Sequence, residues 1–417
     1  MKRYLPYWSY YAHQGMVSAL TMQGVVGYFR HAGADLAQLS WLSLAMLPWV
    51  GKFLWAPWCE RHALPLRGNR YQGSLVLLQL GMAAAIAGIG FLSPTHAAGA
   101  IVAALTLLSL LSLLSASHGI YANGIAICTT DARSRPLANV AQVGDSYLGI
   151  PLGSFVFLTI AERAGWRLGF AGIAALSLLL LIPPLLVRQP MQAAPAGSAR
   201  PRLDWRNLRG IAPALALTAL YLVAMRGLMA LQTVLLVDAG LSLSALGEAV
   251  TVYSTLASGI GIAIGGWAAR RFGAWRGLVP VMLSFPLIAG VLAAGYPYFG
   301  ARAWTLAFGV VNVAAAVGFV TLYNVLMGLT RAHQPASDYA LFQSTDMAVG
   351  MLTSMAVLRL SHDTGYRPVL ALIAVLGVIS LWPAIRLCRR LAGSPAASPT
   401  HAPSPTAHEP SLETVHG

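Results

Sequence analysis

Long apolar segments alternate with short polar breaks along almost the whole chain. A helix needs about 20 apolar residues to cross a bilayer, and cutting at charged or Pro/Gly-rich breaks predicts twelve such segments. Because irregular backbone cannot face lipid, we expect all twelve to be helices. They cover residues 6–28, 36–57, 71–93, 98–122, 138–160, 168–187, 210–236, 245–269, 277–296, 303–329, 339–359 and 368–387.

Two parts of this pattern recur later in the chain. Residues 32–36 (Ala-Gly-Ala-Asp-Leu) open an apolar segment, and residues 239–243 (Ala-Gly-Leu-Ser-Leu) open another one 207 residues later. A Gln and an Asp three residues apart also recur after 201 residues, each pair preceded by a Tyr and an Asn. A duplicated membrane unit with polar residues at matching depths is typical of transporters, whose site lies between the copies. The polar residues are Tyr121, Asn123, Gln142 and Asp145 in the first copy and Tyr323, Asn324, Gln343 and Asp346 in the second.

The longest polar break divides the chain into two parts. Residues 188–209 carry five arginines between two sets of six apolar segments. We therefore predict an all-α integral membrane protein, with a six-helix bundle over residues 1–187, a cytosolic linker over 188–209 and a second six-helix bundle over 210–392. Residues 393–417 are rich in Pro, Ser, Ala and His without an apolar period, which predicts a disordered cytosolic tail.

Composition and charge agree with a lipid environment. The chain is 57% hydrophobic and 10% charged, with a mean hydropathy of +0.65, whereas soluble domains carry about 25% charged residues. Nineteen of the 27 basic residues lie on one side of the predicted bundle and six on the other, with Lys52 and Arg226 inside segments. The positive-inside rule places the richer side, with both termini, in the cytosol. The net charge of +14 therefore reflects topology, and we expect no nucleic-acid partner.

The sequence has no motif of an enzyme or of a bound cofactor. Its three cysteines, Cys59, Cys128 and Cys388, lack C-x-x-C spacing and predict neither a disulfide framework nor a metal site. Neither G-x-S-x-G, nor H-E-x-x-H, nor a phosphate-binding loop occurs. We expect a protein that is not an enzyme, holds no cofactor and uses an ion gradient rather than ATP hydrolysis.

Ionisable residues inside the apolar segments are the main functional candidates, because each costs roughly 2.5–3.5 kcal/mol to insert. Asp145 and Asp346 hold equivalent positions, and Gln142 and Gln343 lie one turn earlier on the same helix face. A buried carboxylate there either couples protons or binds substrate, or is bound to a helix end or to a loop arginine such as Arg133 or Arg270, where it fixes the gate.

Further polar residues lie at comparable depths. Arg226, near the middle of its segment, needs either an anionic substrate or a protein carboxylate. Gln232 follows on the same helix, and Gln23 lies at the equivalent depth of the first segment. His118 is interpreted either as a proton relay or ligand contact, or as a hydrogen-bonded packing histidine. Three amides either bridge helices or contact a polar substrate: Asn123, Asn312 and Asn324. Tyr121 and Tyr323 are further candidates for substrate binding or coupling.

Residues 52–61 (Lys-Phe-Leu-Trp-Ala-Pro-Trp-Cys-Glu-Arg) form a decapeptide at the end of the second segment. It resembles the K-F-x-W-A-P-x-x-[D/E]-R signature of one branch of the major facilitator superfamily. That branch includes muropeptide permeases, acetyl-CoA transporters and importers of siderophores such as rhizobactin and pyochelin, and the compact twelve-segment form is most similar to the importers. The resemblance implies gate or motif roles for Lys52, Trp55, Pro57, Glu60 and Arg61, and for Arg270 and Arg271 in the second half.

The chain departs from that branch at two places. Acidic residues are usual in the fourth segment of the branch, but residues 118–123 read His-Gly-Ile-Tyr-Ala-Asn. Proton coupling must then use other groups, such as Asp145, Asp346 or His118. In the gate loop of the second half, arginine stands where an acid is usual.

The resemblance implies a secondary active transporter with alternating access in the bacterial cytoplasmic (inner) membrane. We predict proton-coupled import of a ferric siderophore by a monomer, whose partners are the substrate, protons and the lipid bilayer. A permease for muropeptides or another amphiphile, or a siderophore exporter, is the alternative. Residues 149–153 (Gly-Ile-Pro-Leu-Gly) resemble the glycine/proline motif of antiporters, which favours export.

Overall fold

The computed structural model describes residues 5–92, 98–129, 149–187, 210–272, 274–329 and 335–392. Throughout these ranges the regular elements are helices, and extended pairing is limited to one bridge between Leu66 and Asn69. Eight helices within these ranges are long and apolar enough to cross a membrane. The described chain therefore fits the all-helical integral membrane protein that the apolar pattern predicts.

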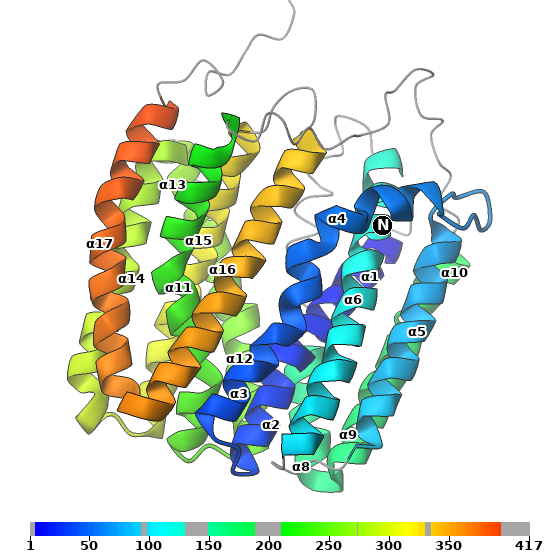
Figure 1. Ribbon diagram of the computed structural model, residues 1–417, viewed down its shortest axis with the longest axis horizontal. Coiled ribbons are helices and arrows are strands. Elements are labelled where there is room, and N and C mark those ends of the chain that lie inside the picture. Colours follow the sequence, from blue (N-terminus) through cyan, green and yellow to red (C-terminus); the bar gives the residue numbers. More distant parts are fainter. Residues whose placement is uncertain are drawn as a thin grey trace, which may run out of the picture.

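The N-terminal helices lie together on one side of the molecule, blue to blue-green in Figure 1. α5 packs against α6 and α9, while α4 packs against α6. Their bounds are α1 (Leu5–Ala19), η2 (Leu20–Gly24), α2 (Val25–His31), α3 (Leu36–Leu42), η3 (Ser43–Met46), α4 (Leu47–Arg61), α5 (Gln72–Gly90), α6 (Ala98–Thr129), η4 (Leu152–Val156), α8 (Phe157–Ala164), α9 (Trp166–Leu179) and α10 (Ile182–Leu186).

The C-terminal helices lie on the other side, green to red in Figure 1. α14 packs against α17, α13 against α15, and α11 against α16 and α17. Their bounds are α11 (Ala212–Asp238), α12 (Leu243–Val252), η6 (Tyr253–Ala257), α13 (Ser258–Phe272), α14 (Ala274–Gly295), η7 (Tyr296–Tyr298), α15 (Ala301–Gly328), α16 (Pro335–Thr364) and α17 (Tyr366–Ala392).

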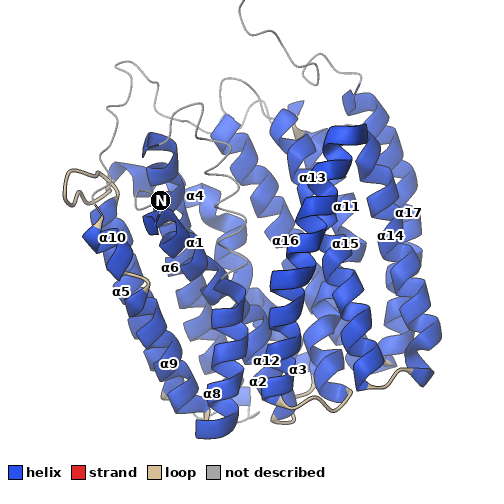
Figure 2. Cartoon of the chain, turned by 180° about the vertical axis from the view of Figure 1, so that it is seen from behind, coloured by secondary structure: helices blue, strands red, loops and turns tan. Residues whose placement is uncertain are grey.

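The two sets of helices meet along α16, which contacts α11 on one side and α3 and α4 on the other. A second junction joins α12 to α8, η4 and α2. Figures 1 and 2, drawn from opposite sides, both show α2, α3, α8 and α12 close together at the lower end of the molecule. The N-terminus lies at the opposite, upper end in both views.

Four of the twelve predicted spans are not among the eight apolar helices: residues 6–28, 36–57, 138–160 and 339–359. The first two are interrupted by the π-helical segment η2 and the 3-10 segment η3, and the third is described only from residue 149. The fourth lies in the continuous helix α16, which carries Asp338, Gln343 and Asp346. The eight apolar helices thus leave a count of twelve spans as a prediction.

The turns of the internal repeat share one backbone conformation. Gly33 and Gly240, 207 residues apart, have φ angles of 95° and 92°. Gly165 and Gly365, 200 residues apart, have φ angles of 88° and 83°. Glycine adopts this left-handed region without the steric cost that other residues meet there. The repeated Gly is therefore a requirement of the turn, while the division into two six-helix bundles and the boundaries 1–187, 188–209, 210–392 and 393–417 stay predictions.

Side-chain caps follow the turns at Gly33 and Gly240. Asp35 accepts from the backbone N–H of Gln38, and Gln38 accepts from the backbone N–H of Asp35, which makes a reciprocal capping box at the start of α3. Ser242 Oγ accepts from the backbone N–H of Ala245 at 3.3 Å at the start of α12. Both caps satisfy N–H groups that the helix itself leaves free.

Helix α1 and the segment around η4 cross with backbone against backbone. A Cβ added to Gly149 would lie 1.9 Å from the carbonyl oxygen of Ala12, and one added to Gly153 would lie 2.0 Å from that of Met16. Small residues permit such crossings between helices in membranes. In this chain Gly149 and Gly153 therefore permit close packing against α1. The crossing lies directly before η2, the π-helical segment that contains Gln23.

Candidate functional site

The buried carboxylate of Asp346 and the half-buried guanidinium of Arg226 form one ion pair among the C-terminal helices. Arg226 of α11 donates from Nε (2.8 Å) and Nη2 (2.5 Å) to Oδ1 of Asp346 on α16. Tyr323 of α15 donates its hydroxyl to Oδ2 of the same carboxylate at 2.7 Å. The Arg226 guanidinium also lies 4.9 Å from the ring centroid of Phe319. We call Arg226, Phe319, Tyr323 and Asp346 the central network, in which one cation and one anion compensate each other in an apolar region.

The sequence left open whether Arg226 pairs with a protein carboxylate and whether Asp346 pairs with a loop arginine. The structure joins the two candidates directly, so the partner of Asp346 is Arg226 rather than the suggested Arg270. The side chain of Arg270 lies outside the described residues. Tyr323 belongs to the same network, whereas Asn324, one residue further, is exposed.

Lys52 connects the decapeptide to the same helix. Its Nζ donates to Oε1 of Gln343 at 3.1 Å, one turn before Asp346 on α16, and lies 4.8 Å from the ring centroid of Trp49. Lys52 is 7% exposed. Among the ion pairs of the described residues, none includes Lys52. α16 therefore presents an amide to one buried cation and a carboxylate to another.

A small cavity of about 40 Å³ lies between the N-terminal and C-terminal helices. Gln23 and Gln232, which the sequence placed at equivalent depths, both line it, and Gln232 accepts from Nδ2 of Asn312 at 2.8 Å. Oε1 of Gln23 is buried without a hydrogen-bond partner. One water occupies about 30 Å³ of liquid volume, so the cavity is too small for an organic substrate in this conformation. It is lined by Gln23, Ile150, Met229, Gln232, Val250, Ser258, Asn312, Ala315 and Phe319.

His118 of α6 belongs to a separate polar group among the N-terminal helices. Its ring lies 5.4 Å from that of His13 and 6.0 Å from that of Tyr10, both on α1, and it is fully buried. Neither of its ring nitrogens has a hydrogen-bond partner. The hydrogen bond expected of a packing histidine is therefore not found among the residues that the structure describes. The other interpretation, a proton relay or ligand contact, stays a prediction.

Tyr121 and Asn123 bridge helices. Tyr121 donates its hydroxyl to the carbonyl of Cys59 at 2.9 Å, and Asn123 Oδ1 accepts from the hydroxyl of Tyr11 at 3.0 Å. Trp55 of the decapeptide donates Nε1 to Ser117 Oγ at 3.1 Å. These bonds hold α4 and α1 against α6, which agrees with the bridging alternative.

The remaining candidates fall at the surface or outside the described residues. Arg61 and Arg271 are exposed, and the side chains of Pro57 and Glu60 are outside the described set. Gln142 and Asp145 lie in the undescribed range 130–148, so their equivalence to Gln343 and Asp346 stays a prediction.

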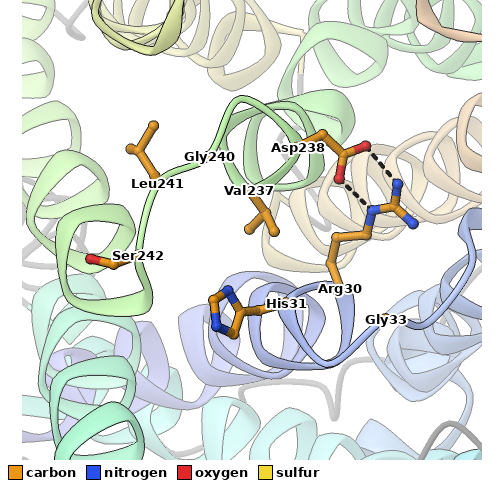
Figure 3. A pocket seen from close by; sticks show the side chains of 8 residues that line it. All are labelled: Arg30, His31, Gly33, Val237, Asp238, Gly240, Leu241 and Ser242. Carbon is orange, nitrogen blue, oxygen red and sulfur yellow. Dashed lines mark hydrogen bonds and ion pairs between the residues drawn. The ribbon is translucent and has the colours of Figure 1, made fainter.

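Sequence reasoning missed a polar contact between the two sets of helices at the lower face of Figure 1. Arg30 of α2 binds both carboxylate oxygens of Asp238 at the end of α11, each at 2.6 Å, and Tyr366 of α17 donates to Asp238 at 2.5 Å. We call Arg30, Asp238 and Tyr366 the latch. Figure 3 shows the two hydrogen bonds between Arg30 and Asp238. The hydrogen bond to Asp238 raises the pKa of Arg30 above its ordinary value, against the opposing effect of burial.

The latch lies beside an open depression of about 580 Å³ at this face, also lined by His31 and Ser242. A second polar contact stands nearby, because Glu162 of α8 accepts from the backbone N–H of Ser244 at the start of α12 at 2.8 Å. The signal in the sequence was the repeat itself: Arg30 and Asp238 directly precede the two matching turns and carry opposite charges. The latch and the Glu162 contact thus tie the two sets of helices together at one face.

Comparison with known proteins supports a membrane transporter. The chain is 26% identical over 290 residues to the anhydromuropeptide permease of Escherichia coli strain K12, and equally to that of Escherichia coli O157:H7. The match covers 68% of this chain and 57% of each relative, so the chain matches little more than half the length of these curated relatives. No family model matches the chain. Both relatives are permeases rather than enzymes, and neither is a siderophore importer by name.

Proposed function

We propose that this chain is a secondary active permease of the bacterial cytoplasmic membrane that carries an anionic small molecule. The observation that carries the proposal is the central network, where Asp346 binds both Arg226 and Tyr323 and its own side chain is buried. An arginine at membrane depth is costly and usually serves an ion or substrate pathway. The similarity to permeases supports the same class of function.

In this proposal, an anionic group of the substrate replaces Asp346 as the hydrogen-bond partner of the Arg226 guanidinium. A planar guanidinium binds a carboxylate through two parallel hydrogen bonds, so a substrate carboxylate reproduces the geometry of the resident one. Lys52 supplies a second buried cation whose acceptor is the neutral amide of Gln343. The exchange frees Asp346 and Tyr323, which loosens α16 from α11 and α15 and permits the helices to move.

Two cargo classes fit this arrangement. A muropeptide-type cargo is favoured by the similarity to anhydromuropeptide permeases. A ferric siderophore is favoured by the decapeptide that contains Lys52 and Trp55 and by its resemblance to the siderophore-importer group. Both classes carry oxygen anions that a guanidinium binds.

Transport assays with both cargoes test the proposal. Right-side-out and everted vesicles containing the protein receive radiolabelled anhydromuropeptide or ferric siderophore under an imposed proton gradient. We expect gradient-driven uptake of one of them, in one orientation. A charged hydrogen bond contributes about 1.5–3 kcal/mol, so Arg226→Gln should lower uptake of that cargo about tenfold to a hundredfold.

The matched control is Arg302→Gln, which removes an exposed arginine from α15. It should transport like the wild type. Equal uptake by Arg226→Gln and Arg302→Gln would remove Arg226 from the binding site. Absence of uptake of both cargoes, in either orientation, would contradict both proposed cargo classes.

A further inference from the structure

The N-terminal helices bury a polar group that the proposed substrate site does not use. His13 of α1 and His118 of α6 face each other with ring centroids 5.4 Å apart, and both are fully buried. Ser115, one turn before His118, and Ser177 of α9 are also fully buried. Gln14 approaches the same point, because a Cβ added to Gly119 would lie 2.7 Å from its Nε2. We call His13, Gln14, Ser115, His118 and Ser177 the histidine cluster.

Most polar atoms of the histidine cluster lack partners. His13 Nε2 and Ser177 Oγ are 2.7 Å apart and form the one hydrogen bond between these side chains. His13 Nδ1, both nitrogens of His118, Gln14 Nε2 and Ser115 Oγ are buried without a partner. Buried polar side chains are usually hydrogen-bonded, so each exception needs an explanation.

A purely structural role explains this pattern poorly. A neutral imidazole has one N–H donor and one acceptor nitrogen, and a packing histidine gains stability by pairing at least one of them. Among the described residues, neither ring nitrogen of His118 has a hydrogen-bond partner. Two polar side chains are nevertheless close in the chain or in space: Ser115 on the same helix, and Gln14, which approaches Gly119. The acceptor nitrogens are therefore available to a proton and the donors to a water that carries it.

The surroundings of the pair contain no balancing charge among the described residues. α1 contributes Tyr10 and Tyr11, of which Tyr10 contacts His118. The titratable groups of α4 with described side chains are engaged or remote: Lys52 binds Gln343, Cys59 is buried beside Tyr121, and Arg61 is exposed. α5 carries no titratable residue. With respect to the described residues, a proton on His13 or His118 would thus be a buried charge without a counter-charge, and it favours an arrangement that admits water or a counter-charge.

We propose that the His13–His118 pair is the proton-binding site that couples this permease to the proton gradient. A ring nitrogen of one histidine accepts a proton from water on one side of the membrane, the charged pair favours the alternate arrangement of α1 and α6, and the proton leaves to water on the other side. This inference rests on the proposed transport function. It also accounts for coupling in a chain whose fourth apolar segment contains His118 but lacks the acids that the resemblance leads us to expect there.

Two transport measurements distinguish proton coupling from substrate binding: accumulation of substrate driven by a pH gradient, and counterflow of substrate without a gradient. In proteoliposomes, a gradient of one pH unit drives about tenfold accumulation for each coupled proton. His118→Gln should abolish this accumulation, while counterflow of labelled against unlabelled substrate stays within about twofold of the wild type. The control His62→Gln changes an exposed histidine directly after α4 and should leave both measurements unchanged. Wild-type accumulation by His118→Gln would overturn the proposal.

A titration without substrate keeps the test independent of the cargo. Trp49 lies beside the cluster, with its ring 3.6 Å from the position of a Cβ on Gly119. His62 stacks on Trp58 at 4.6 Å, so the titration uses a His62→Gln background to remove that signal. Tryptophan fluorescence of the purified protein should then show a transition as the pH is lowered and the pair takes up a proton. The transition should vanish when His118→Gln is added.

A transition unchanged by His118→Gln would overturn the proposal even where no cargo has been found. Loss of all transport with a retained, His118-dependent transition would instead contradict the proposed cargo and leave the proton site supported. If His118→Gln fails to fold, by size-exclusion profile, His13→Gln takes its place with the same expected split between accumulation and counterflow.

Discussion

The central network and the histidine cluster are both buried polar groups in an apolar protein, yet they are paired to opposite extents. In the central network, Arg226 binds Asp346 twice and Tyr323 binds the remaining carboxylate oxygen. In the histidine cluster, one hydrogen bond joins His13 to Ser177, and both nitrogens of His118 have none. The first group is electrically compensated and the second is polar without charge.

This difference in hydrogen bonding indicates that the two groups have different roles. A saturated ionic network holds its helices in one arrangement until a competing anion arrives, because removing one partner leaves a buried charge. An unsaturated neutral group costs stability at all times and is retained where something binds to it. The comparison therefore predicts that apolar substitutions change the free energy of unfolding in opposite directions in the two groups.

The largest effect is expected at Asp346. Asp346→Ala removes the buried carboxylate that binds Arg226 and Tyr323, which should lower the free energy of unfolding by about 3–5 kcal/mol. Unfolding of the purified protein in denaturant, followed by tryptophan fluorescence, measures the loss. Asp363→Asn, which changes an exposed carboxylate at the end of the same helix, is the control and should have little effect.

The double variant Arg226→Met with Asp346→Leu should recover most of that stability, because apolar residues replace both charges together. A loss as small as that of Asp363→Asn in the single variant would show that the central network does not hold α11 against α16.

The second prediction concerns His118 and has the opposite sign. His118→Leu removes two buried nitrogens without partners, each kind of unsatisfied group costing about 1–3 kcal/mol. The free energy of unfolding should therefore rise by an amount in that range, while proton-driven accumulation is lost. His13→Leu is the matched comparison and should gain less, because it also breaks the bond to Ser177. Destabilisation by His118→Leu would remove the contrast between the two regions.

The third prediction moves the comparison to the surface. The latch is paired as completely as the central network, but Arg30 and Asp238 are 22% and 24% exposed. Asp238→Asn should therefore lower the free energy of unfolding by only about 1 kcal/mol or less. Its larger effect should be on access: a reporter introduced by Leu241→Cys, in the depression beside the latch, should react faster with a charged maleimide.

Arg359→Gln serves as the control for the latch, because it breaks a half-exposed ion pair within α16 alone. It should leave the labelling rate unchanged. Equal labelling in all three backgrounds would show that the Arg30–Asp238 pair does not restrict opening of this face.

The helices of this protein were predictable where the chain is uniformly apolar. The segment predicted over residues 71–93 corresponds to α5, and the one over 303–329 to α15. The interruptions η2 and η3 were not, because they depend on packing against other helices, such as the crossing at Gly153. Hydropathy indicates whether a segment can lie in lipid, but it contains little information about how the segment packs against neighbouring helices.

The site was predictable in its members and less so in its pairing. Depth in an apolar segment identified Arg226, Asp346 and His118 as candidates, but which of them meet depends on which helices are adjacent. The sequence therefore suggested a loop arginine for Asp346, whereas α16 places it against α11. Lys52 was assigned to a motif, and its contact with Gln343 required the same knowledge of α4 beside α16.

The smallest effect is expected at Glu162, where a single, exposed contact joins the two sets of helices. Hydrogen bonding from Ser244 lowers the pKa of Glu162 below its ordinary value of 4.5. A lowered carboxyl pKa contributes stability that is present above the ordinary value and is lost as pH falls through the lowered one. Glu162→Gln keeps an acceptor for the N–H of Ser244 and removes the charge at the start of α12, so it should cost only a few tenths of a kcal/mol at neutral pH.

The difference in free energy of unfolding between the wild type and Glu162→Gln should therefore shrink as the pH is lowered below 4.5 and should not grow there. Arg163→Gln is the matched control, because it changes an exposed charge beside Glu162 on α8 and leaves the contact with Ser244 in place. A pH-independent difference would mean that the negative charge of Glu162 does not act on α12. In that case the contact across this face would depend on the latch, and the effect of Asp238→Asn on labelling should be the same with and without Glu162→Gln.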